Sequence, residues 1–384
     1  MKVLHLADLH LGKRVNAFNM IEDQSFALEN IKDLVGKEGV DLVLIAGDIY
    51  DQKLPSNEAI CLFDHFLTEL TRKNIKCLII PGNHDSEDRL TFASQLLKES
   101  GIYLARQGER FYEKLTLEDE YGFINFYLLP FLKPIDLKGK LGGNKGIEGM
   151  EDIEIDDFQK ALSYVVGTID LDKNQRNVLM VHQFIVGAER SESEEIYLGG
   201  LEAVPLDTFD DFDYVAMGHI HKRQSFRDGM VSYPGSLLKY SKSEANYKKL
   251  IRIVDFHSKG EIEIKELEIK YLRDMRIIEG YLEDLLRNGL IDEAKDDYIH
   301  AVLYDEDEQV DAIGRLRKIY PNIMTLVYQD QGKDGLNLED IELKEKKDPL
   351  KLFEEFYEIR NNKKLDEGKK ALISSYVKKI WGGI

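Results

Sequence analysis

The chain has 384 residues and a mass of 44.3 kDa, and with 43% hydrophobic and 32% charged residues it has the profile of a folded protein large enough for more than one domain. This composition excludes a disordered chain, and because no apolar run approaches the roughly 20 residues of a membrane span, we expect no membrane-spanning segment. The formal net charge of −19 argues against broad, nonspecific coating of nucleic acid, but it leaves room for local contacts with phosphates.

Strands and helices are predicted to alternate through the first eighty residues. Apolar runs predict buried strands at 2–7, 42–47 and 76–80, and apolar residues at helical spacing predict helices near 21–36 and 57–72. Two successive strand–helix–strand units are typical of a layered α/β fold with parallel strands. Ligands bind at the carboxyl ends of such strands, so we expect a site there.

The first two strands end in groups that bind divalent metals. Asp8 and His10 are two residues apart, which places a hard oxygen and an imidazole nitrogen on one face of an extended chain. Asp48 follows Gly47 at the end of the second strand, and its two oxygens could bridge a pair of ions. A solvated turn aspartate and a histidine at the edge of the core are the structural alternative for the first pair.

The third strand is followed by Pro81-Gly82-Asn83-His84-Asp85. Asn83 offers a neutral carbonyl oxygen to a metal, and His84 can reach a substrate phosphate or a leaving oxygen without being a ligand. We assign Asp85 to holding the His84 ring. Taken alone, the same residues are also an ordinary turn sequence.

The middle of the chain is less regular. Alternating apolar and polar residues predict more strands between 102 and 131, and the Gly-, Lys- and Glu-rich stretch at 133–157 predicts a long surface excursion. A helix is predicted to begin at Phe158, and a buried strand is predicted at 177–182.

Three more histidines lie at predicted strand ends. His182 ends the strand at 177–182, and His219 and His221 repeat the spacing of Asp8 and His10. Three histidines in such positions are hard to explain by structure alone. Those without comparable neighbours we interpret as structural: His5, His65, His257 and His300.

The candidate ligands form a mixed set of oxygen and imidazole groups without a thiolate. Such a set suits Mn²⁺, Fe²⁺ or Zn²⁺, and one bridging carboxylate matches two ions roughly 3.5 to 4 Å apart. A two-metal centre activates water and holds a phosphate for in-line attack. The seven candidates are Asp8, His10, Asp48, Asn83, His182, His219 and His221.

In this order, Asp-x-His, Gly-Asp-x-x-Asp, Gly-Asn-His-Asp, a single His and Gly-His-x-His resemble the calcineurin-like metallophosphoesterase superfamily. The stretches at 7–12, 82–89 and 214–236 resemble the SbcD-type nuclease subunits within it, and this resemblance covers essentially the whole chain. It implies a four-layer α/β/β/α metallophosphoesterase sandwich with a small α/β capping domain and a helical C-terminal tail. It also implies that one ion is held by Asp8, His10, Asp48 and His221 and the other by Asp48, Asn83, His182 and His219, while His84 contacts the scissile phosphate and assists the leaving 3′ oxygen.

The second half is predicted to hold a small domain and a tail. After a closing hairpin at 250–269, three strands alternate with two helices between 275 and 329, which is a strand–helix repeat of its own. Residues 343–384 hold 11 Lys or Arg against 7 Asp or Glu, and two short amphipathic segments there predict a partner-binding surface. We expect a nuclease domain at 1–270, a capping domain at 271–335 and a partner-binding tail at 336–384.

The resemblance implies a DNA nuclease with two divalent ions, for which we expect Mn²⁺. The implied activities are a 3′ to 5′ exonuclease on duplex ends and an endonuclease on single strands and hairpins, in DNA end processing, recombination and repair. The implied partners are DNA, an SbcC-type ATPase bound through the tail, and a second copy of the chain in a homodimer. The alternatives are a phosphomonoesterase or cyclic-nucleotide phosphodiesterase, and a scaffold of the same fold without catalysis.

Basic residues follow several of the ligand motifs, and we predict that they contact DNA phosphates at the rim of the site. An ordinary solvated surface is the alternative for each. The residues are Lys13, Arg14, Lys53, Arg89, Lys222 and Arg223.

The sequence also predicts the cellular compartment of the protein. Cys61 and Cys77 show no spacing typical of a zinc site, so we interpret them as reduced thiols. The first five residues lead straight into the first motif, and the apolar region of a signal peptide is not among them. We therefore expect a cytoplasmic protein, associated with the nucleoid.

Overall fold

The computed structural model describes residues 1–108, 110–143, 155, 157–194, 203–329, 350, 353, 365, 368–370 and 372–374. The chain divides into two compact units, Met1–Gln329 and Asp330–Ile384, of which only the first is described nearly throughout. Most of the predicted tail at 336–384 lies outside the described residues, and so does most of the second half of the predicted excursion at 133–157. The predicted domain boundaries therefore stay predictions.

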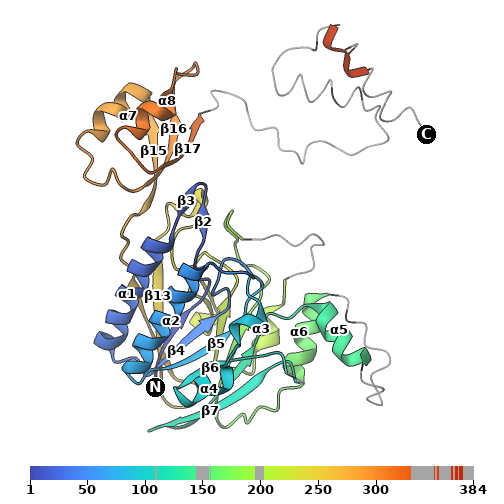
Figure 1. Cartoon of the computed structure of the whole chain (residues 1–384). Helices are drawn as coiled ribbons and strands as arrows, with labels where there is room; N and C mark the ends of the chain where they lie inside the picture. Colours follow the sequence, from blue (N-terminus) through green and yellow to red (C-terminus); the bar gives the residue numbers. More distant parts are fainter. Residues whose placement is uncertain are drawn as a thin grey trace. The chain divides into compact units, whose positions relative to one another are not determined.

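The first sheet has six strands, and its centre is parallel, as the alternation of strands and helices predicts (Figure 1). Helices α1 (Ile21–Glu38) and α2 (Asn57–Arg72) cover its outer face. Its strands in spatial order are β14 (Ile262–Glu268), β13 (Leu250–Phe256), β1 (Lys2–Leu6), β4 (Leu42–Ala46), β5 (Lys76–Ile80) and β6 (Ile102–Leu104).

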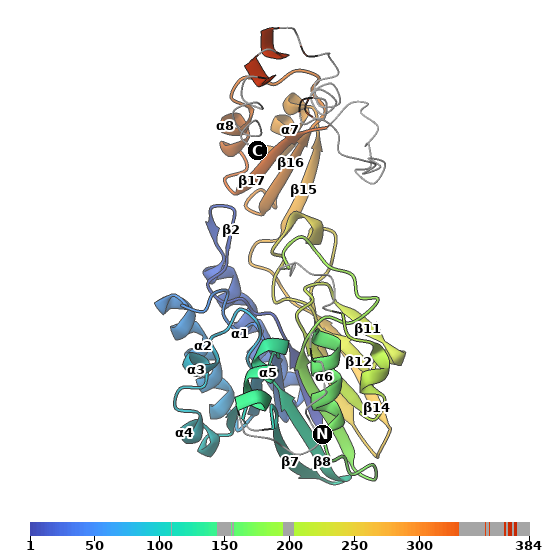
Figure 2. The same ribbon diagram turned by 90° about the vertical axis from the view of Figure 1, so that its right-hand side faces the viewer.

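The second sheet also has six strands, and it is covered by α5 (Pro134–Gly143) and α6 (Phe158–Gly167) (Figure 2). Its core packs Leu137 and Leu162 of the two helices against Leu179 and Val181 of the sheet. Its strands in spatial order are β11 (Gln224–Phe226), β12 (Val231–Tyr233), β10 (Tyr214–Gly218), β9 (Arg176–His182), β8 (Gly122–Leu129) and β7 (Glu113–Asp119).

The two sheets pack face to face through an apolar layer. Successive residues of a strand point to opposite faces, so in β4 Val43 faces the helices, whereas Leu44 faces the second sheet. Leu44 meets Phe126 and Met180 there, and all three are completely buried. Burying side chains of this size stabilises a fold by roughly 1.5–3 kcal/mol each. The four-layer α/β/β/α fold class is thus confirmed.

The predicted surface excursion at 133–157 begins with a helix, which corrects that interpretation. Pro134 is the first residue of α5, a position where the missing N–H of proline costs nothing. Leu137 is completely buried in the core of the second sheet and anchors the helix. The sequence did not predict this helix because glycines at 139, 142 and 143 are poor helix formers and interrupt the spacing of its apolar residues.

The predicted strand–helix repeat after residue 270 is present and forms a separate parallel sheet of three strands. Tyr298 donates a hydrogen bond to Asp23 of α1 at 2.7 Å, and Lys239 pairs with Asp274 at 2.8 Å, so the small sheet is tied to the larger sandwich. Its elements are β15 (Met275–Gly280), α7 (Leu282–Gly289), β16 (Tyr298–Leu303), α8 (Ala312–Arg317) and β17 (Ile323–Tyr328).

Seven short elements complete the described part of the chain. They are the hairpin β2 (Arg14–Val15) and β3 (Phe18–Asn19), the helices α3 (Glu87–Leu90) and α4 (Ser94–Glu99), and the 3-10 turns η1 (Leu206–Phe209), η2 (Arg227–Gly229) and η3 (Lys242–Glu244).

Among the described helices we find none with the length and apolar character that a membrane span needs.

Candidate metal centre

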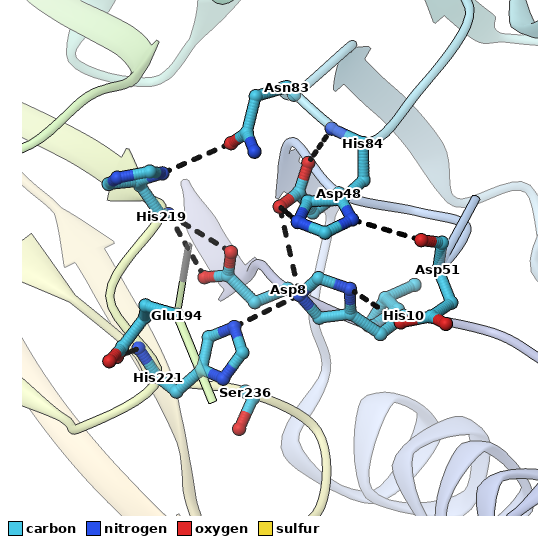
Figure 3. A network of polar contacts seen from close by, with 12 residues as sticks. Asp8, His10, Asp48, Asp51, Asn83, His84, Glu194, His219, His221 and Ser236 are labelled. Carbon is cyan, nitrogen blue, oxygen red and sulfur yellow. Dashed lines mark hydrogen bonds and ion pairs between the residues drawn. The ribbon is translucent and has the colours of Figure 1, made fainter. Parts of the chain in front are cut away.

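All seven candidate ligands converge where the carboxyl ends of the two sheets meet, and Figure 3 labels six of them, all but His182. The first sheet contributes the residues that follow β1, β4 and β5, and the second contributes the last residue of β9 and the turn after β10. All seven side chains lie in buried residues. From the first sheet come Asp8, His10, Asp48 and Asn83, and from the second come His182, His219 and His221.

The first group of ligand atoms belongs to Asp8, His10 and His221, whose atoms all lie within 4.8 Å of one another. The Nε2 atoms of His10 and His221 are 2.9 Å apart. Asp8 accepts hydrogen bonds from the backbone N–H of His219 at 3.0 and 3.2 Å. These bonds fix the Asp8 carboxylate across the junction of the two sheets.

The second group surrounds Asp48. Its Oδ2 lies 3.4 Å from Nε2 of His182, 3.7 Å from Nε2 of His10 and 3.9 Å from Nε2 of His84. Asp48 lies within reach of both the His10 and the His182 side of the centre, as a bridging ligand requires, and Asp8 also has ligand atoms near both sides. Asn83 Oδ1 lies 3.0 Å from His182 Nε2 and 3.1 Å from His219 Nδ1.

The contacts of His182 fit a cation bound among these groups. Nδ1 of His182 lies 2.8 Å from the carbonyl oxygen of Ala46, so in the neutral ring the proton is on Nδ1. Its Nε2 faces the oxygens of Asn83 and Asp48, an arrangement that either a second proton on the ring or a metal ion between these atoms would stabilise. Divalent ions suited to oxygen and imidazole ligands fit this arrangement.

The pKa values of Asp48, His182 and Asp8 are all shifted by burial and by the charges of their neighbours. Burial opposes ionisation of Asp48, but the neighbouring histidines, His182 above all, hold its pKa well below the ordinary value. Burial also opposes charging of His182, yet Asp48 raises the pKa of that ring to about 9. Burial raises the pKa of Asp8 well above the ordinary value, and the Asp48 carboxylate adds to this effect. Two carboxylates so close together repel each other when both are ionised, and divalent ions bound beside them would offset this repulsion.

The backbone at the site is strained. Asp8, His10, Asp48 and His219 have φ values of 52°, 44°, 51° and 102°, which lie outside the region that side chains with a Cβ prefer. Residues in such conformations cost of order 1–3 kcal/mol each and cluster at functional sites. The folded sandwich therefore enforces the positions of these four side chains.

Gly218 allows the two sheets to meet closely at the site, and Gly82 allows the loops after β4 and β5 of the first sheet to do so. A Cβ on Gly218 would lie 1.8 Å from the backbone oxygen of Ala46, and a Cβ on Gly82 would lie 2.2 Å from Oδ1 of Asp48. Neither contact can be relieved by moving the end of a flexible side chain, because backbone or the buried carboxylate blocks it. The glycines of Gly-His-x-His and Gly-Asn-His-Asp thus have a steric role.

The structure corrects the role predicted for Asp85. The Asp85 carboxylate accepts hydrogen bonds from the backbone N–H groups of Ile49, Tyr50 and Gly82 at 2.9–3.1 Å. The His84 ring is oriented instead by the residue 33 positions earlier, because its Nδ1 lies 2.9 Å from the carbonyl oxygen of Asp51. Asp85 therefore fixes the two ligand loops to each other, and burial together with Asp48 raises its pKa to about 6.

Several of the predicted DNA contacts are already engaged with acidic side chains. Lys13 pairs with Asp51 at 2.7 Å, Lys222 pairs with Glu189, and Arg223 donates to Glu266 at 2.7 Å. Such pairs weaken the attraction of these cations for phosphates.

The other three predicted contacts differ from these. Arg14 donates to the carbonyl oxygen of Ala17 within its own hairpin at 2.9 Å. Arg89 on α3 is exposed, and the exposed Lys53 lines a cavity of about 560 Å³ that Asn83 also lines. Lys53 is thus a basic side chain placed next to the centre.

The sequence reasoning missed a group of residues around His221. Ser193 lies 2.6 Å from His221 Nδ1, and Glu194 accepts from the His221 backbone N–H at 2.6 Å (Figure 3 draws the second contact). Both residues lie in the long polar loop after β9, and no periodic pattern marks them.

Comparison with known proteins identifies relatives over the whole chain. Residues 1–223 match the family model described as calcineurin-like phosphoesterase, and residues 271–361 match one described as type 5 capsule protein repressor C-terminal domain. The SbcD subunit of the SbcCD nuclease of Staphylococcus epidermidis is 32% identical over 373 residues, which are 96% of this chain and 95% of that protein.

Two solved structures are similar in part. A dimetal phosphatase from Danio rerio is 13% identical, with a TM-score of 0.41 over 70% of this chain and 98% of that one. A protein from Thermus thermophilus is 12% identical, with a TM-score of 0.39 over 70% of this chain and 99% of that one.

Proposed function

Because this chain belongs to the calcineurin-like phosphoesterase family and, within it, to the SbcD nucleases, we propose that it cuts DNA at a two-metal centre between its two sheets. Membership of this family makes it a metal-dependent phosphodiesterase. The observation that carries the proposal is the convergence of two buried carboxylates, an amide oxygen and four buried histidines at one junction. So complete a set of ligand groups favours catalysis over a scaffold role.

We propose that two Mn²⁺ ions occupy this centre, one held by Asp8, His10, Asp48 and His221 and the other by Asp48, Asn83, His182 and His219. When bound, such ions polarise a water molecule and neutralise phosphate charge. The protein positions the remaining group, because the Asp51 carbonyl accepts from Nδ1 of His84 and so leaves Nε2 as the nitrogen nearer Asp48. There His84 can hold a proton for the leaving 3′ oxygen.

The proposed activities are 3′ to 5′ exonuclease cleavage of duplex ends and endonuclease cleavage of single strands and hairpins. The test is cleavage of end-labelled duplex and hairpin DNA with Mn²⁺, after removal of metal by a chelator, and after Mn²⁺ is restored. We expect cleavage that the chelator abolishes and Mn²⁺ restores. Faster turnover of a phosphate monoester or a cyclic nucleotide at equal enzyme would favour the phosphomonoesterase or cyclic-nucleotide phosphodiesterase alternative.

We propose Lys53 and Arg89 as phosphate contacts, because both are exposed and lie in the segments after β4 and β5. Replacing both by alanine should weaken DNA binding and reduce its dependence on salt by about one unit of slope per lost contact. Binding of a short duplex at several salt concentrations measures this. Lys248→Ala, which removes an exposed lysine that pairs with Glu268, is the control. Equal slopes for the double variant and the control would remove these residues from the interface.

We propose that residues 348–384 bind an SbcC-type ATPase. This proposal rests on the net positive charge and the two amphipathic segments of this stretch, and on the printed name of the Staphylococcus epidermidis relative as one subunit of SbcCD. A chain that ends at Lys347 should keep its melting temperature and its cleavage of short DNA but lose co-purification with the ATPase. A truncated chain that is strongly destabilised yet still binds the ATPase would make the tail part of the protein's own core.

A homodimer and a cytoplasmic location at the nucleoid stay predictions. Phe92 and Leu96, four positions apart in and just before α4, are 79% and 71% exposed, and we propose them as a surface on which a second copy could pack. Sedimentation of the purified chain would measure it.

A further inference from the structure

His221 is held by three side chains, two from neighbouring residues of the loop after β9 and one from just before β13. Ser193 Oγ lies 2.6 Å from Nδ1 of its ring, and Glu194 accepts a hydrogen bond from its backbone N–H at 2.6 Å. Lys249 donates to its backbone carbonyl oxygen at 2.8 Å. His221 is therefore fixed at the ring and at both backbone groups.

Behind Ser193 lies a buried ion pair. Glu244 accepts from Ser193 Oγ through Oε1 at 2.6 Å and from Lys249 Nζ through Oε2 at 2.5 Å. The side chains of Glu244 and Lys249 are only 0% and 3% exposed. A carboxylate so deeply buried is kept ionised by a cation in direct contact, and Lys249 is that cation.

This ion pair sets the direction of the hydrogen bonds. An ionised carboxylate only accepts, so the single hydroxyl proton of Ser193 is donated to Glu244. The lone pairs of Ser193 Oγ then accept the proton on Nδ1 of His221. Ser191 Oγ, 2.8 Å from Ser193 Oγ, can donate to the second lone pair and does not compete for this proton.

The consequence lies at the other nitrogen of the ring. With the proton on Nδ1, Nε2 of His221 carries a lone pair, and it faces Nε2 of His10 at 2.9 Å. Metal binding requires this tautomer, because the ligating nitrogen must be free of a proton. His10 has no comparably close contact to its own Nδ1 in the described chain, since the Asp51 carboxylate oxygen beside it is 3.5 Å away.

We propose that Ser193, oriented by the Glu244–Lys249 pair, is the positioning residue that holds His221 in its metal-binding tautomer. The inference rests on the proposed two-metal centre. Partners of this kind typically contribute 10- to 100-fold to metal affinity. Ser193→Ala should therefore weaken binding of one of the two Mn²⁺ ions by roughly 10- to 100-fold and leave the other unchanged.

The experiment is a Mn²⁺ titration of the metal-free full chain, followed by calorimetry, for the unaltered protein and three variants. Ser193→Thr keeps a hydroxyl and should retain the affinity of the unaltered protein. Ser241→Ala is the matched control, because Ser241 also donates to Oε1 of Glu244, at 2.9 Å, but lies outside the hydrogen bonds of His221. Unchanged affinity of Ser193→Ala, or an equal loss in Ser241→Ala, would overturn the proposal.

A second measurement does not depend on any variant folding. The ¹⁵N chemical shifts of the His221 ring in the metal-free, unaltered protein report which nitrogen carries the proton. A proton on Nδ1 supports the proposal, and a proton on Nε2 overturns it. Neither readout requires DNA cleavage, so a chain that showed this tautomer yet cut no DNA would contradict the proposed function and not the role of Ser193.

Discussion

Replacing Asp48 by alanine should abolish DNA cleavage and greatly reduce metal binding at both positions. Oδ2 of Asp48 lies within 3.4–3.9 Å of Nε2 in three histidines, and its residue is only 2% exposed. Without this carboxylate, both proposed ions lose a ligand at once. The pKa of His182, which Asp48 raises, should also fall, and of the two carboxylates among the proposed ligands only Asp8 would remain to attract cations.

Elemental analysis of the purified variant, together with the nuclease assay, measures both effects. Asp48→Asn is the comparison variant, because an asparagine keeps the shape of the aspartate side chain. Its amide oxygen can still accept a hydrogen bond from the backbone N–H of His84, which lies 2.9 Å from Oδ1 of Asp48. It should also fail to hold two ions, since the charge is lost. If Asp48→Ala still carried two ions per chain and cut DNA, the bridging role would have to be abandoned.

Replacing His84 by alanine should have the second-largest effect, and it should act on rate alone. His84 is partly exposed, with 16% of its side chain accessible, whereas all seven proposed ligands are buried. Its backbone N–H supports Asp48, and alanine keeps that group. A proton-transfer group contributes roughly 10²- to 10⁴-fold, so cleavage should fall by that factor while metal content and DNA affinity stay unchanged.

Single-turnover cleavage at saturating Mn²⁺, with metal analysis of the same sample, separates the two roles. His65→Ala removes an exposed histidine on α2, 56% of whose side chain is accessible, and serves as the control. A parallel loss of metal in the His84 variant would make His84 a ligand. A rate equal to that of the control would leave it without a part in the chemistry.

The ligands at the strand ends of the first sheet could be predicted from sequence because each depends only on a short stretch of residues. Each apolar run stops at a polar group, and parallel strands bring their carboxyl ends to one edge. The histidines of the second sheet followed from their places at predicted strand ends and from the spacing of Gly-His-x-His. How the two sheets meet could not be predicted from either pattern, because it depends on the close approach of Gly218 in β10 to the backbone oxygen of Ala46 in β4.

The errors have physical reasons too. The sequence predicts that Asp85 holds the His84 ring because the two residues are neighbours, but the Asp85 carboxylate binds three backbone N–H groups, and Nδ1 of His84 contacts the carbonyl oxygen of Asp51, 33 positions earlier. Ser193 and Glu244 were missed because a hydroxyl in a polar loop and one more glutamate among many carry no periodic or spacing signal. Their importance arises only from the fold, which brings positions 51 residues apart within 2.6 Å.

The split of the centre between two sheets has a consequence for how the enzyme is made. A ribosome synthesises the ligands of the first sheet within the first 83 residues, but His221 comes much later, and β13, which pairs directly with β1, ends only at Phe256. Domains fold as units during synthesis, so the growing chain cannot assemble both halves of the centre until about two thirds of it have been made. A nascent nuclease of this design is thereby kept from cutting nucleic acid before both of its large sheets have been made.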